Sequence, residues 1–88
     1  MKRVEFDKKF IKHYKLRIKN QPNLSRQYDR RFEKFCTDKQ DPVLKNHFLK
    51  GSKKDVRAFS ITGDIRVVYR ETAEAYVFLD IGTHNQVY

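Results

Sequence analysis

Apolar residues recur at about every fourth position through the first part of the chain. The first stripe consists of Phe6, Phe10, Tyr14 and Ile18, which stand among lysine and arginine. This spacing predicts an amphipathic helix. An interruption at 20–23 contains Pro22, a residue suited to the first turn of a new helix. The second stripe consists of Leu24, Tyr28, Phe32, Phe35 and Cys36. The pattern predicts two helices that form a hairpin.

The period of the apolar pattern changes to two near residue 55. Alternation over 55–61 predicts a strand, and Thr62-Gly63-Asp64 supplies the chemistry of a tight turn. Two further strands are predicted, over 65–70 and over 76–81. The last of these is apolar on both faces except at Asp80, which is typical of a central strand.

The remaining segments are short and irregular in pattern. Asp41-Pro42 marks the exit from the second helix, and 43–54 forms a connection or a short turn. Residues 2–6 form either a short strand or a simple lead-in. We therefore predict an α+β fold, in which an N-terminal helical hairpin packs on a small antiparallel sheet within a single domain spanning 1–88.

The positive charge is concentrated in the predicted helices. Residues 1–40 contain 13 Lys and Arg against 5 Asp and Glu, whereas residues 41–88 contain 7 against 6. Such a surface favours a polyanion, so nucleic acid and an acidic protein are the first candidate partners. The alternative is an ordinary solvated helix surface, since charge patterning governs association and not fold.

The chain carries few signs of export, membrane insertion or metal binding. Cys36 is the single cysteine, so it cannot form an internal disulfide, and we expect it to be a small core residue. The first residues are charged and no long apolar run follows them. We expect a cytoplasmic protein with no membrane segment, no metal site and no cofactor.

A set of residues in the second half of the chain has a specific order and spacing. It consists of His47-Phe48-Leu49-Lys50-Gly51, Arg57, Gly63-Asp64-Ile65-Arg66-Val67-Val68-Tyr69, Ile81-Gly82-Thr83-His84 and Val87-Tyr88. This set resembles the RelE/ParE toxin superfamily, and within it the YafQ-like mRNA interferases. The resemblance implies a RelE-like fold and the toxin of a type II toxin–antitoxin system. It also implies a ribosome-dependent endoribonuclease that cleaves messenger RNA in the decoding site.

The resemblance also assigns roles to individual residues. The catalytic positions of YafQ-like enzymes match His47, Asp64 and His84. Arg66 stands where many relatives place an arginine near the phosphate, and Tyr88 matches an aromatic near the C-terminus. The sequence departs from the family where a further histidine aligns with Ser60 and a tryptophan with Ile65. These departures leave the division of acid and base roles open.

These residues suit RNA cleavage without a metal, which needs a base, an acid and a cation beside the phosphate. Histidine has the side-chain pKa nearest neutrality, and a flexible Gly-Thr presents His84 at the end of the last strand. We expect His84 to be the general acid or base. Asp64 and His47 share the complementary role or orient the substrate, and Arg66 with Arg57 stabilises the phosphate.

Each of these residues also has a purely structural interpretation. His84 could be an ordinary polar residue after a strand, His47 could cap a loop, and Asp64 suits a turn in any case. The arginines could form ion pairs, Arg66 with Asp80 or Glu74, and the terminal Tyr88 could fray. His13, among lysines on the first helix, is expected to be exposed.

The predicted RNA contacts extend beyond the catalytic positions. They are Arg57, Tyr88, Lys53, Lys54, Lys12, Lys15, Arg30 and Arg31. The expected partners are messenger RNA, ribosomal RNA and a cognate antitoxin protein. A ParE-like inhibitor of DNA gyrase that lacks enzymatic activity is the alternative function. A plain RNA-binding module is a third, but no RRM-like aromatic signature or GXXG loop supports it.

Overall fold

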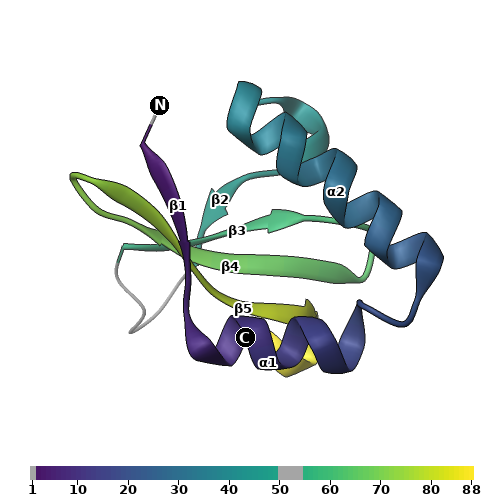
Figure 1. Cartoon of the computed structure of the whole chain (residues 1–88). Helices are drawn as coiled ribbons and strands as arrows, with labels where there is room; N and C mark the ends of the chain where they lie inside the picture. The colour runs from purple at the N-terminus through teal and green to yellow at the C-terminus, as the bar shows by residue number, and fades with distance from the viewer. Residues whose placement is uncertain (1, 50–54) are drawn as a thin grey trace.

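The computed structural model describes residues 2–49 and 55–88 and has the predicted α+β architecture (Figure 1). The elements in chain order are β1 (Arg3–Phe6), α1 (Lys8–Arg17), α2 (Pro22–Thr37), the 3-10 turn η1 (Pro42–Leu44), β2 (His47–Phe48), β3 (Val56–Ser60), β4 (Ile65–Glu71), β5 (Ala75–Thr83) and α3 (His84–Val87). The two long helices and the three long strands were all predicted. The short elements β2 and α3 were not. No helix in the described ranges is long and apolar enough to span a membrane.

The strands form one five-stranded sheet in the order β1-β5-β4-β3-β2. The last four strands are antiparallel neighbours, whereas β1 pairs with β5 in parallel. Residues 2–6 therefore contain a strand, and the sheet is mixed where a purely antiparallel one was expected. Since β1 joins the edge of β5, the chain enters α1 directly beside that strand, and the side chain of Asp7 caps the helix by accepting from the backbone N–H of Lys9 (2.9 Å).

The main core lies between the two long helices and one face of the sheet. Phe10 of α1 and Phe35 of α2 both pack against Phe78 on β5, with ring centroids 5.5 Å apart in each case. The two helices meet through Tyr14 and Tyr28, whose rings are 5.0 Å apart. Aromatic rings therefore join both helices to β5, an interior strand of the sheet, which confirms the amphipathic stripes read from the sequence.

The opposite face of the sheet has a smaller apolar cluster. Its buried members are Val56, Ala58, Val68 and Val87. Val87 comes from α3, so the C-terminal helix covers part of this second face. Cys36 of α2 is only partly buried and so is not the core residue expected, although burial raises the pKa of its thiol.

His13 corrects one expectation, because it is not an exposed helix residue. Its side chain is 18% exposed, and its Nδ1 lies 2.6 Å from Oδ1 of Asp80, a carboxylate that is itself 7% exposed. The lysines around His13 suggested an exposed position, and Asp80, its partner, is 67 residues away in the sequence, so the contact could not be predicted. A buried carboxylate needs hydrogen bonds or opposite charge, and α1 supplies them.

Two lysines bind the carboxylate of Glu71 at the end of β4. Glu71 accepts hydrogen bonds from Lys2 (2.6 Å) and Lys39 (3.0 Å), which hold the pKa of its carboxyl below the ordinary value. A carboxyl whose pKa is lower in the folded than in the unfolded chain stabilises the fold above the unfolded value, about 4.3. That stabilisation is lost as the pH falls through the folded value.

We therefore expect Glu71→Gln to lower the melting temperature at pH 7 and to have little effect at pH 3. Thermal unfolding at the two pH values measures this difference. Glu74→Gln is the matched control, because the side chain of Glu74 is 78% exposed. A deficit of Glu71→Gln that is equally large at pH 3 would contradict the ionic origin of the stabilisation.

Candidate active site

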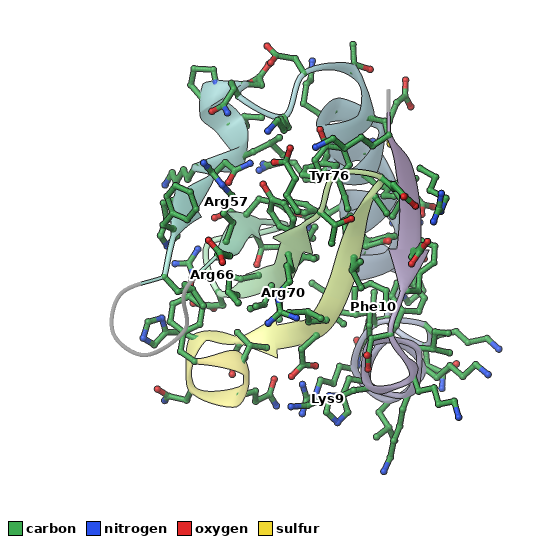
Figure 2. The ribbon with its side chains drawn as sticks, turned by 90° about the vertical axis from the view of Figure 1, so that its left-hand side faces the viewer. Lys9, Phe10, Arg57, Arg66, Arg70 and Tyr76 are labelled. Carbon is green, nitrogen blue, oxygen red and sulfur yellow. The ribbon has the colours of Figure 1, made fainter. Side chains whose placement is uncertain are left out.

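Asp64, Arg66 and His84 line one open pocket of about 400 Å³ on the face of the sheet that carries α3. The other lining residues are Gly63, Thr83 and Asn85. Figure 2 shows this face, with Arg66 and Arg70 in front of the sheet near the yellow α3. The turn between β3 and β4 supplies Asp64, and Thr62 fixes the turn by accepting from the backbone N–H of Asp64 (3.1 Å).

Arg66 is held by a hydrogen bond from the neighbouring strand. Its Nη1 donates to Oγ of Ser60 (2.7 Å), directly across from it in the β3–β4 register. The expected alternative of an ion pair with Asp80 or Glu74 is not what the structure shows, since no described carboxylate pairs with Arg66. Ser60 therefore orients a cation at the pocket.

The segment that carries His84 is a tightly packed cap and not a flexible linker. Thr83 and Gln86 form a capping box, in which Oε1 of Gln86 accepts from the backbone N–H of Thr83 (2.7 Å). A side-chain Cβ at Gly82 would lie 2.6 Å from Nη1 of Arg17 and 2.6 Å from Oε1 of Gln86. Arg17 and Gln86 therefore pack closely over this glycine, and their side-chain ends would have to move to admit a Cβ. This packing corrects the expectation of a flexible segment.

Tyr88 joins the two predicted catalytic histidines. Its ring packs edge-on against His84, with centroids 4.1 Å apart, and its hydroxyl lies 3.4 Å from Nε2 of His47. The pKa of Tyr88 is raised by burial, so the hydroxyl keeps its proton at neutral pH. Its backbone N–H donates to the carbonyl of His84 (3.0 Å), so Tyr88 continues the last turn of α3.

The hydrogen bonds of His47 define its tautomer when the ring is neutral. Nδ1 lies 2.8 Å from the carbonyl oxygen of Lys45, which can only accept, so Nδ1 carries the proton. Nε2 then has a free lone pair and accepts from Tyr88. Pairing of β2 with β3 places His47 opposite Ala58, on the same face as the small apolar cluster. The structure thus brings His47, Tyr88 and His84 into one row.

Arg57 lies on the other face of the sheet from this row. It is opposite Tyr69, whose ring is in the main core, and its guanidinium stacks on Phe48 at 3.7 Å from the ring centroid. No described carboxylate forms an ion pair with Arg57. The register therefore places Arg57 and Arg66 on opposite faces of the sheet, which does not support the predicted action of both arginines at a single phosphate.

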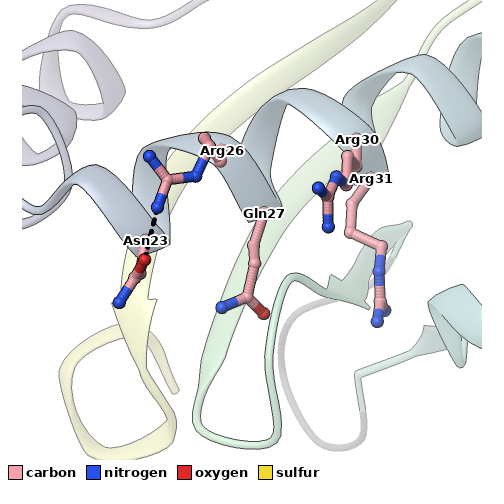
Figure 3. Close-up of a pocket in the computed structure, with 5 residues that line it drawn as sticks. All are labelled: Asn23, Arg26, Gln27, Arg30 and Arg31. Atoms are coloured by element: carbon pink, nitrogen blue, oxygen red, sulfur yellow. Dashed lines mark hydrogen bonds between the residues drawn. The ribbon is translucent and has the colours of Figure 1, made fainter.

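The helical residues predicted to bind RNA lie outside the pocket. Lys12 and Lys15 are exposed on α1. Arg30 and Arg31 line a second open pocket of about 430 Å³ on α2, together with Asn23, Arg26 and Gln27 (Figure 3). Arg31 is also structural, because its Nη1 donates to the carbonyls of Val43 (2.9 Å) and Ser60 (3.3 Å). Lys53 and Lys54 lie outside the described residues.

Sequence reasoning missed the supporting residues of the site. The sequence pattern did not indicate that Ser60 would hold Arg66 or that Gln86 would cap α3. The capping pattern Thr83-His84-Asn85-Gln86 was the available signal for the latter. Among the described residues, no three or more His, Cys, Asp or Glu side chains gather as potential metal ligands.

Comparison with known proteins gives a consistent result. The family described as bacterial toxin of type II toxin–antitoxin system, YafQ, matches residues 2–88. The structure is similar to that of a metal-bound toxin from Helicobacter pylori, with 28% identity, a TM-score of 0.79 and full coverage of both chains. It is also similar to the toxin in the Escherichia coli DinJ-YafQ toxin–antitoxin complex, with 26% identity, a TM-score of 0.75 and coverage of 100% of this chain and 99% of that one.

The fold is shared more widely than these sequences. A YoeB/ParE toxin from Agrobacterium tumefaciens has 14% identity and a TM-score of 0.76, with coverage of 93% of this chain and 98% of that one. Comparison with curated proteins found no significant match.

Proposed function

Because the chain belongs to the YafQ family of type II toxin–antitoxin toxins, we propose that it is an endoribonuclease that cleaves messenger RNA in the decoding site of the ribosome. One observation carries the proposal: Asp64, Arg66 and His84 line a single pocket, and Tyr88 links that pocket to His47. Titratable groups and a cation therefore surround a space that a phosphodiester can enter.

The proposed reaction uses the 2′-hydroxyl of the RNA as its own nucleophile. A base removes the hydroxyl proton, the oxygen attacks phosphorus, and the bond to the 5′-oxygen breaks to leave a 2′,3′-cyclic phosphate. An acid then protonates the departing 5′-oxygen, so atoms and charges balance. His84 supplies one of these proton transfers, and Asp64 or His47 supplies the other or orients the substrate. None of these steps requires a metal.

Arg66 has the geometry of an electrostatic stabiliser. One of its guanidinium nitrogens is held by Ser60, so the group is fixed before the substrate arrives. A preorganised cation beside the phosphorus stabilises the charge that develops in the transition state without reorganisation at that moment. Tyr88 offers an aromatic face beside His84, on which a base can stack.

The basic helices supply the proposed contact with the ribosome. Lys12 and Lys15 on α1 and Arg30 and Arg31 on α2 are away from the pocket, so they can contact phosphates of ribosomal RNA while the pocket holds the messenger. Both RNAs and the ribosome would place the protein in the cytoplasm. The complex of the E. coli relative with DinJ supports an antitoxin partner here as well, acidic where it meets the basic surface.

The test is cleavage of a labelled messenger by the purified protein, with and without programmed ribosomes, followed by mapping of the cut sites. We expect cuts at discrete positions that appear only when ribosomes are present. Cleavage of free RNA alone would contradict the ribosomal site of action. No cleavage by the folded protein in either condition would reject the nuclease, and a DNA gyrase supercoiling assay would then test the ParE-like alternative.

A further inference from the structure

The carboxylate of Asp80 on β5 is enclosed by basic side chains from α1. Nδ1 of His13 lies 2.6 Å from Oδ1, Nη1 of Arg17 lies 3.6 Å from the same oxygen, and Nζ of Lys9 lies 3.8 Å from Oδ2. The three are four residues apart along α1, so they share one helix face. Asp80 also accepts from the backbone N–H of Ile81 (2.8 Å). This cluster lies just before the strand ends at the pocket.

Arg17 connects the cluster to the start of α3. Its Nη1 donates to the carbonyl of Ile81 (2.8 Å) and lies against Gly82, so close that it would have to move if Gly82 carried a Cβ. Gln86 of α3 lies against the same glycine and closes the capping box with Thr83. Arg17 and Gln86 therefore pack over one residue, Gly82, which is two positions before His84.

A helix as short as α3 cannot set its own position. It has four residues, and isolated helices of this length are unstable in water. Val87 anchors one side of it in the small apolar cluster. His84 itself is exposed, so burial does not hold its ring in place. The contact with Arg17 at Gly82 supplies a second support, from α1.

We propose that Arg17, together with His13 and Asp80, positions the start of α3 and so places His84 at the pocket and Tyr88 against His84. The three are positioning residues, since none of them lines the pocket. The expected effect of these residues on RNA cleavage rests on the proposed function. Their expected effect on the position of α3 does not. Displacing a reacting group by about 1 Å costs up to roughly 100-fold in rate.

Two variants test the contact in different ways. Arg17→Lys keeps a positive charge near Asp80 but removes the planar donor that bonds Ile81 and covers Gly82. Gly82→Ala leaves every charge in place and inserts a methyl group where Arg17 and Gln86 now lie. Arg3→Lys is the matched control, because Arg3 is on β1 with its side chain 61% exposed.

The first readout is NMR of the protein without RNA. We expect Arg17→Lys and Gly82→Ala to weaken the nuclear Overhauser contacts between the rings of His84 and Tyr88 and to shift the ring-proton signals of His84. The second readout is single-turnover cleavage at a series of protein concentrations. We expect a loss of about 10-fold or more in the maximal rate constant, with the half-saturating protein concentration within about twofold of the wild type. Arg3→Lys should match the wild type in both.

The two readouts separate the inference from the proposed function. Wild-type ring contacts in both variants, even with reduced thermal stability, would overturn the positioning role and leave the cluster purely structural. Altered ring contacts in a protein whose wild type cleaves no RNA would retain the positioning role and reject the nuclease. If Gly82→Ala does not fold, the spectrum of Arg17→Lys decides the question alone.

Discussion

Replacing His84 by glutamine is expected to lower the rate of RNA cleavage by roughly 10²- to 10⁴-fold, the usual contribution of a general acid or base. Glutamine keeps a polar side chain of similar reach but cannot exchange a proton near neutral pH. His84 is exposed and its backbone carbonyl, not its ring, receives the bond from Tyr88. We therefore expect the melting temperature to change little.

The measurement is single-turnover cleavage on programmed ribosomes, with circular dichroism to confirm folding. Glu74→Gln is the matched control, since it introduces the same side chain at an exposed position in the connection between β4 and β5. Cleavage by folded His84→Gln at the wild-type rate would remove His84 from the mechanism. The acid or base would then have to be sought in Asp64 and His47.

The long elements were predictable because their apolar period is intrinsic to the sequence. Four aromatic or aliphatic residues and a cysteine at helical spacing leave α2 few alternatives, and a period of two indicates β3. The short elements carry no such period. The four residues of β1 become a strand only because β5 offers an edge to pair with, and α3 depends on capping and on Val87.

The candidate site was predictable only in part, for a similar reason. The order of His47, Asp64 and His84 along the chain was enough for a family resemblance, and the structure places all three on one face of the sheet. Their supports come from distant segments. The contact of His13 with Asp80 spans 67 residues, and no pattern local to α1 reveals it.

The relative placement of Arg57 and Arg66 depends on strand register, which could not be predicted from the sequence. The alternation of β3 places Arg57 with Phe59 on one face, whereas the prediction placed Arg57 and Arg66 at the same phosphate. The register pairs Arg57 with Tyr69 and Arg66 with Ser60, so the two arginines point away from each other across the sheet. Side chains alternate between the two faces of a sheet, so the register of paired strands decides which of them share a face and can act together.

Phe78→Ala is expected to cost about 3–5 kcal/mol of the free energy of unfolding, the range for removing a large aromatic side chain from a packed core. Phe78 is fully buried in β5. Six rings pack against it, from both long helices and from three strands: Phe6, Phe10, Phe32, Phe35, Phe59 and Tyr69. Truncation leaves a cavity that rings on several elements cannot all move to fill.

Denaturant unfolding of Phe78→Ala and Phe48→Ala side by side measures this difference. Phe48 loses the same atoms but is 57% exposed and stacks on Arg57, so we expect a cost of about 1 kcal/mol or less. In a domain of this size the core variant should melt roughly 12–40 °C lower than the wild type. Equal costs for the two variants would mean that β5 is not the centre of the core. β5 also carries Asp80 and leads into α3, so that outcome would contradict the structural basis of the proposed site.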